Sequence, residues 1–198
     1  MERLFPPEPY LDVIDPLSAF LGAGNGTMRY TFADAVKLAG HACPTVAGAF
    51  LMARHGMMRL FPDELPRRGE VEVIAAGAVD AGVNGPIGQV VTLLTGAAAT
   101  NGFAGLGGRF VRKGLLRYGG ESQGLSGWLF HRPATGVRIR LTFSAQAFPL
   151  DAEVAALMPR LLAGEGDPLL ETRFRDGWRN RVVAMLADAG RQTVRELP

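Results

Sequence analysis

A histidine and a cysteine stand two positions apart in the first quarter of the chain, and both side chains can do chemistry. His41 and Cys43 flank one alanine, and Pro44 follows. A cysteine thiolate is a nucleophile and a soft metal ligand, and a neighbouring imidazole suits zinc and related metals. Cys43 is the only cysteine in the sequence, and His41 is one of three histidines. The pair is therefore our first candidate for a metal site.

The same pair has a plainer structural interpretation, which the sequence leaves open. A lone cysteine is most often a small buried hydrophobic side chain rather than a reactive group. In that case His41 and Cys43 would form only a joint between two helices.

The flanking residues predict that the pair lies in a short break between two helices. Residues 31–34 have the form of a capping box, which starts a helix that Gly40 ends. Pro44 fits the first position of a second helix, expected over residues 45–60. Cys43 would then stand at a helix N-terminus, where the dipole and the free amide groups favour a thiolate.

Composition limits the classes of protein that fit. The 198 residues are 47% hydrophobic, enough for one domain, or one domain with an appendage, to bury a full core. One cysteine excludes an internal disulfide framework and a cysteine-rich structural zinc module. The net charge is +2 and the basic residues are mixed with acidic ones, so no nucleic-acid partner is expected.

The expected location is the cytoplasm. Residues 1–7 lack the charged and then apolar pattern of a secretory signal. No apolar run in the sequence is long enough to span a bilayer, so no membrane partner is expected.

Further along the chain, the pattern predicts a mixture of helices and strands. The expected elements are an extended arm over 1–9, a short helix within 10–21, a strand at 70–75, a helix at 86–96, a glycine-rich loop at 101–108, a hairpin at 127–143, and helices at 151–162 and 169–194. This order predicts an α+β fold, with a mixed or antiparallel sheet whose hairpin packs against helices. We divide it into an N-terminal arm and short helix (1–30), a core (31–149) and a helical C-terminal extension (150–198).

Three blocks within residues 31–143 form a recognisable series. They are Gly40-His41-Ala42-Cys43-Pro44 with Ala47-Gly48, then Leu94-Thr95-Gly96 with Asn101-Gly102, and then Arg117-Tyr118-Gly119 with Leu129-Phe130 and Thr135-Gly136-Val137-Arg138-Ile139. In content and order these blocks resemble the FmdE-like family of formylmethanofuran dehydrogenase proteins.

The resemblance implies an α+β core, a homodimer, and a divalent metal ion such as zinc near the His-x-Cys element. In methanogens the family is associated with molybdenum formylmethanofuran dehydrogenase, and many other members have no assigned reaction. Several members carry a C-terminal zinc finger. No cysteine follows Cys43 here, so the segment 150–198 stands in place of that finger.

The resemblance carries over only part of the family's metal shell. His41 and Cys43 match as ligands. The family's Asp-x-Cys-x-x-Asp run is altered, with Asn84 and Gln89 at the positions of its two aspartates, and Asp80 could substitute only with a shift of the loop. We take these three residues as groups that contact the metal ligands, a substrate or a cofactor. A partner chain, His131, His55 or a bound small molecule would complete the shell.

These observations leave three hypotheses for the function. In the first, the chain is a metal-binding protein of this family, and an enzyme if the site at His41 and Cys43 performs Lewis-acid or thiolate chemistry. Alternatively, it binds haem or another cofactor through the same two residues, since both types are axial haem ligands. In the third hypothesis it is a non-catalytic accessory protein of a metalloenzyme.

Overall fold

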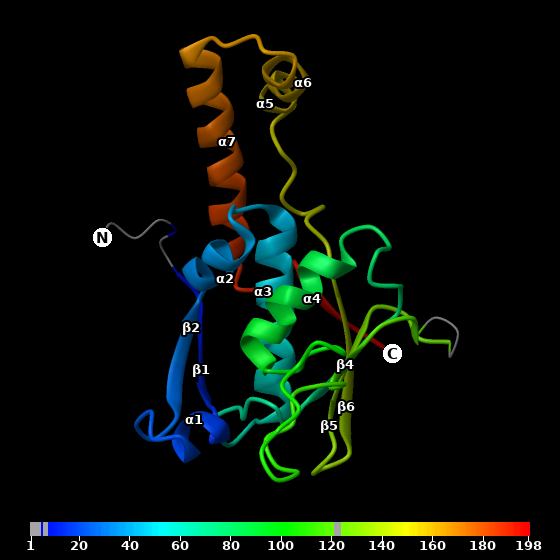
Figure 1. Cartoon of the computed structure of the whole chain (residues 1–198). Helices are drawn as coiled ribbons and strands as arrows, with labels where there is room; N and C mark the ends of the chain where they lie inside the picture. The colour runs from blue at the N-terminus through cyan, green and yellow to red at the C-terminus, as the bar shows by residue number, and fades with distance from the viewer. Residues whose placement is uncertain (1–4, 6–7, 121–123) are drawn as a thin grey trace.

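The computed structural model describes Phe5 and residues 8–120 and 124–198, so most of the predicted arm over 1–9 lies outside the described residues. The α+β prediction is confirmed (Figure 1). The helices are α1 (Pro16–Phe20), α2 (Phe32–Ala39), α3 (Pro44–Leu60), α4 (Asn84–Thr95), α5 (Ala152–Ala155), α6 (Leu157–Leu162) and α7 (Pro168–Ala187). The strands are β1 (Tyr10–Ile14), β2 (Thr27–Thr31), β3 (Glu72–Ala75), β4 (Leu116–Arg117), β5 (Trp128–Arg132), β6 (Val137–Phe143) and β7 (Val194–Leu197).

The strands form two sheets. The larger sheet has the order β4-β3-β5-β6-β7, with β3 parallel to β4 and the other neighbours antiparallel. The predicted hairpin is β5-β6, in which Trp128 stands opposite Leu141. The smaller sheet pairs β1 with β2. The pattern did not predict β1, β2 or β7.

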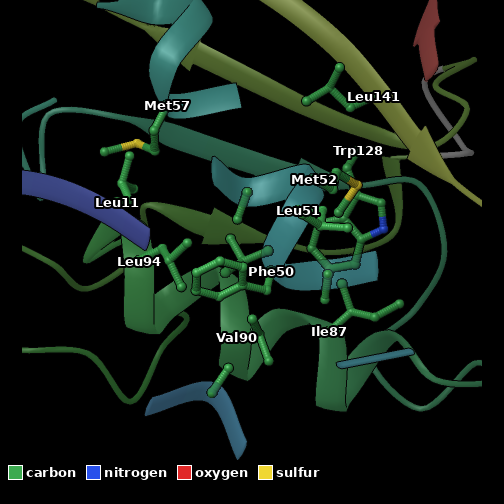
Figure 2. Packing of buried hydrophobic residues seen from close by; sticks show 14 of the residues in the cluster. Leu11, Phe50, Leu51, Met52, Met57, Ile87, Val90, Leu94, Trp128 and Leu141 are labelled. Atoms are coloured by element: carbon green, nitrogen blue, oxygen red, sulfur yellow. The ribbon is translucent and has the colours of Figure 1, made fainter. Parts of the chain in front are cut away.

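Helix α3 is the centre of the molecule because it is buried between the larger sheet and α4. Eleven of its side chains or glycines are buried, including Phe50, Met52 and Met57. Figure 2 shows part of this core, where Phe50, Leu51 and Met52 of α3 lie among Ile87, Val90 and Leu94 of α4 and Trp128 and Leu141 of the sheet.

Gly48 lets α3 approach strand β6 closely. A Cβ atom built on Gly48 would lie 2.1 Å from Cδ2 of Phe143, far inside van der Waals contact. The missing side chain therefore makes room for the Phe143 ring between helix and sheet. Gly48 belongs to the first block of the family resemblance, and this contact is a physical reason for a glycine there.

The C-terminal segment packs on the core with its apolar face, as its spacing predicts. Val182, Met185 and Leu186 of α7 are buried in the same cluster as α3. In Figure 1 the first part of α7 rises away from the body beside α5 and α6. No helix in the described ranges is both long enough and apolar enough to cross a membrane.

The prediction of one helix over 169–194 was wrong at its C-terminal end. Helix α7 stops at Ala187 because the Asp188 carboxylate accepts hydrogen bonds from the backbone N–H groups of Gln192 and Thr193. The chain then turns, and β7 pairs with the edge of β6. The predicted helix at 151–162 is divided at Ala156, which places Pro159 in the first turn of α6, where a missing N–H is tolerated.

Candidate functional site

The joint between α2 and α3 has the predicted form. The Thr31 N–H donates to Asp34 Oδ2 at 2.9 Å in the capping box of α2, and Gly40 ends that helix with φ +76°. Cys43 is the N-cap of α3, and Pro44 is the first helical residue. Local sequence alone therefore places His41 and Cys43 in a break of a few residues between two helices.

The His41 ring is oriented by the backbone, which also fixes its tautomer. Its Nδ1 atom lies 3.0 Å from the carbonyl oxygen of Ala39. A carbonyl oxygen can only accept a hydrogen bond, so Nδ1 carries the proton. In the neutral ring the lone pair is then on Nε2, and the exposed ring can offer that atom to a ligand. A metal-binding histidine is commonly held in this way.

The Cys43 thiol stands at the positive end of α3. Its Sγ atom accepts a hydrogen bond from the Val46 N–H at 3.5 Å, and the residue is half-buried. The side chain is therefore partly sheltered and stands at the first turn of the helix.

A pocket of about 220 Å³ brings the joint together with α4. His41 and Cys43 line it from one side, and Gln89 lines it from α4. The remaining wall is apolar or uncharged and consists of Leu38, Ala39, Thr45, Val46, Val83, Pro86 and Val90. The structure thus unites three of the predicted site residues.

Asn84 and Asp80 are placed differently. The Asn84 side chain donates through Nδ2 to the carbonyl oxygen of Ala78 at 2.9 Å, which closes the turn before α4. Asp80 lies exposed in that turn. Neither residue is in the described wall of the pocket. Asn84 therefore shapes the start of the helix that carries Gln89, and does not itself reach the joint.

His131 lies on the face of the larger sheet that points away from α3. Phe130 is fully buried on the face covered by α3, and side chains alternate along a strand, so His131 points away from the core. Its Nδ1 atom is 3.1 Å from Glu72 Oε2 on β3. His55, the other predicted alternative, lies on α3 and has Nε2 3.1 Å from Glu196 Oε1. Within one chain, both histidines face other partners.

The donor set at the joint is therefore small. Among the described residues, no group of three or more histidine, cysteine, aspartate or glutamate side chains could hold a metal ion. The described residues of one chain therefore do not form a closed zinc centre with four protein ligands. The pocket offers one imidazole and one thiol as its strong donors.

Trp178 of α7 contacts the joint, and the sequence pattern did not predict this. Its Nε1–H donates to the carbonyl oxygen of Ala42 at 2.9 Å, and its ring lies 5.8 Å from that of Phe174. Ala42 stands between His41 and Cys43, so the C-terminal helix holds the backbone that carries both side chains. The amphipathic pattern of α7 predicted a packed helix, but no local signal pointed to this partner.

Comparison with known proteins adds no relatives: no protein-family model and no curated protein matches this chain. The resemblance to the FmdE-like family therefore stays a prediction that rests on the three sequence blocks.

Proposed function

We propose that this chain binds a divalent metal ion, with zinc as the first candidate, through Nε2 of His41 and Sγ of Cys43. The observation that carries the proposal is their arrangement in one pocket. The Ala39 carbonyl holds Nδ1 of His41, which leaves Nε2 as the donor atom of the neutral ring, and Cys43 Sγ stands at the N-cap of α3. The resemblance to the FmdE-like family implies the same two ligands.

Two protein donors leave coordination positions for other groups. Catalytic zinc sites usually hold three protein ligands and keep one position open. Gln89 is a further polar group in the wall, and a second copy of the chain or a bound small molecule could supply another donor. When bound, the metal would supply a Lewis acid to an oxygen-containing group in the pocket. The chain's own part is to orient the imidazole through Ala39 and to hold the joint through Trp178.

The homodimer is part of the same proposal, because the family resemblance implies it and symmetric pairs are the commonest oligomers. The expected result of light scattering at micromolar concentration is a mass of twice 21.1 kDa. A mass of one chain would contradict it. The cytoplasmic location also stays a prediction.

Metal analysis tests the proposed function. Wild type, Cys43→Ser, His41→Ala and the control His55→Ala are purified side by side without chelator, and metal content and absorption spectra are measured. We expect bound metal in wild type and His55→Ala, and its loss from the other two with unchanged circular dichroism. Serine has nearly the volume of cysteine but is a poor donor to soft metals.

Other outcomes separate the alternatives. A Soret band that disappears in Cys43→Ser would support a haem protein. Equal metal and cofactor content in all four proteins would overturn the site. The joint would then be structural, which is the result expected of an accessory protein.

A further inference from the structure

A second hollow adjoins the pocket at His41 and Cys43. It has a volume of about 420 Å³, and its lining includes residues of α4 as well as Asn101 and Tyr118. Leu38 and Gln89 line both hollows, so the two lie side by side. We call the two hollows together the groove; its wall comes from α2, the joint, α4 and β4. The second hollow alone has a size in the range of small-molecule sites, about 300–1,000 Å³.

The groove is uncharged. In the part of the chain that the structure describes, its wall contains no aspartate, glutamate, lysine or arginine in either hollow. A carboxylate or phosphate bound in the second hollow would lose water without gaining an ionic partner from its wall, which is strongly unfavourable. The composition of the wall therefore favours a neutral ligand.

Four polar side chains give the second hollow its hydrogen-bonding groups. Gln89 and Asn101 contribute amides, and Thr92 and Tyr118 contribute hydroxyls. Such a combination orients a neutral ligand by its amide, carbonyl or hydroxyl groups, while its apolar body contacts side chains such as Leu38 and Leu116.

The Tyr118 ring is held in place from two sides. A Cβ atom on Gly88 would lie 1.9 Å from the Tyr118 hydroxyl oxygen, so only glycine leaves room for the ring against α4. On the other side the ring meets Trp128 edge-on, with centroids 6.2 Å apart. Burial raises the pKa of Tyr118, so at neutral pH its hydroxyl keeps its proton and can donate a hydrogen bond.

We propose that this groove binds an elongated, uncharged organic molecule with an apolar body and amide, carbonyl or hydroxyl groups, placing one end beside His41 and Cys43. The chemical role of that end rests on the proposed metal function. The preference for an uncharged body along α4 does not, because it follows from the wall of the second hollow alone.

A matched pair of fluorescent probes tests the preference. N-phenylnaphthylamine is neutral, and anilinonaphthalenesulfonate has the same ring system with an added negative charge. We expect saturable fluorescence enhancement with the neutral probe and affinity for the sulfonate weaker by about tenfold or more. Equal or tighter binding of the sulfonate, or no saturable binding of the neutral probe, would overturn the proposal.

Two substitutions locate the binding. Leu38→Glu puts a carboxylate in the middle of the groove at a residue that is 45% exposed, so the fold should tolerate it. Leu162→Glu is the control, because Leu162 lies on α6 and is 82% exposed. We expect about tenfold weaker binding of the neutral probe in Leu38→Glu and no change in the control. The same affinity in both variants would place the probe elsewhere and refute the groove.

The failure of one proposal can be told from the failure of the other. Cys43→Ser should lose metal but keep the neutral probe, and Leu38→Glu should keep metal but lose the probe. If Cys43→Ser retains wild-type metal content while the probe results hold, the metal function fails and the groove stands. If the metal measurements agree with the proposed function but the probe measurements do not agree with the groove proposal, only the groove proposal is refuted.

Discussion

Replacing Trp178 by phenylalanine removes one hydrogen bond to the joint and keeps an aromatic ring on α7. The lost bond is the one from Nε1–H to the Ala42 carbonyl, 2.9 Å long and partly buried. A net contribution of about 0.5–1.5 kcal/mol is typical of such a bond. For a chain of this size, 1 kcal/mol changes the melting temperature by about 2–4 °C. The backbone between His41 and Cys43 would also be held less firmly, so zinc affinity should fall by about three- to tenfold.

The assay for Trp178→Phe combines thermal unfolding, followed by circular dichroism, with zinc competition against a chromophoric chelator. Phe174→Leu is the control, because it disturbs the ring that packs on Trp178 and leaves the bond to Ala42 in place. We expect both variants to lose stability and only Trp178→Phe to lose zinc affinity. Unchanged zinc affinity in Trp178→Phe, despite lower stability, would refute the idea that α7 positions the joint.

Two further predictions concern packing and pH. Gly48→Ala should destabilise the protein by about 1–3 kcal/mol in urea unfolding, because the new methyl group meets the Phe143 ring. Adding Phe143→Leu should recover part of this loss; a double variant whose loss of stability equals the sum of the two single losses would contradict the contact. Hydrogen bonding to His55 lowers the pKa of Glu196 below its ordinary 4.5, so this carboxylate stabilises the fold above that pH and the contribution disappears as pH falls through the lowered value. Glu196→Gln should therefore be less stable than wild type at pH 7, and only slightly so because the Glu196–His55 pair is surface-exposed. The stabilities of the two proteins should converge in acid; a difference in stability that does not change with pH would contradict this.

The parts of the fold that the sequence predicts are those whose signals are local. The capping box, Gly40 and Pro44 fix the ends of α2 and α3 from neighbouring residues. The hairpin of β5 and β6 follows from a strict alternation over 137–143. Strands β1, β2 and β7 are short, and each becomes a strand only because a distant or neighbouring edge pairs with it.

The same distinction applies to the candidate site: local patterns predict one part of it, and tertiary packing determines the other. Cys43 and His41 occupy one joint through local signals, whereas Gln89 and Trp178 reach it only through tertiary packing. The bond from Trp178 to Ala42 spans 136 positions, which no local pattern can predict. His131 is different, because its outward direction follows from strand alternation: if Phe130 faces the core, the next side chain must face away.

Cobalt substitution tests the central claim most directly. Cobalt(II) commonly replaces zinc at sites of this kind, and a thiolate bound to cobalt gives a charge-transfer absorption in the near ultraviolet. Wild-type protein titrated with Co²⁺ should develop that band to saturation, and Cys43→Ser should not develop it, while both proteins keep the same circular dichroism. A wild-type spectrum that matches Cys43→Ser, or matches Co²⁺ in buffer, would contradict a metal site at His41 and Cys43.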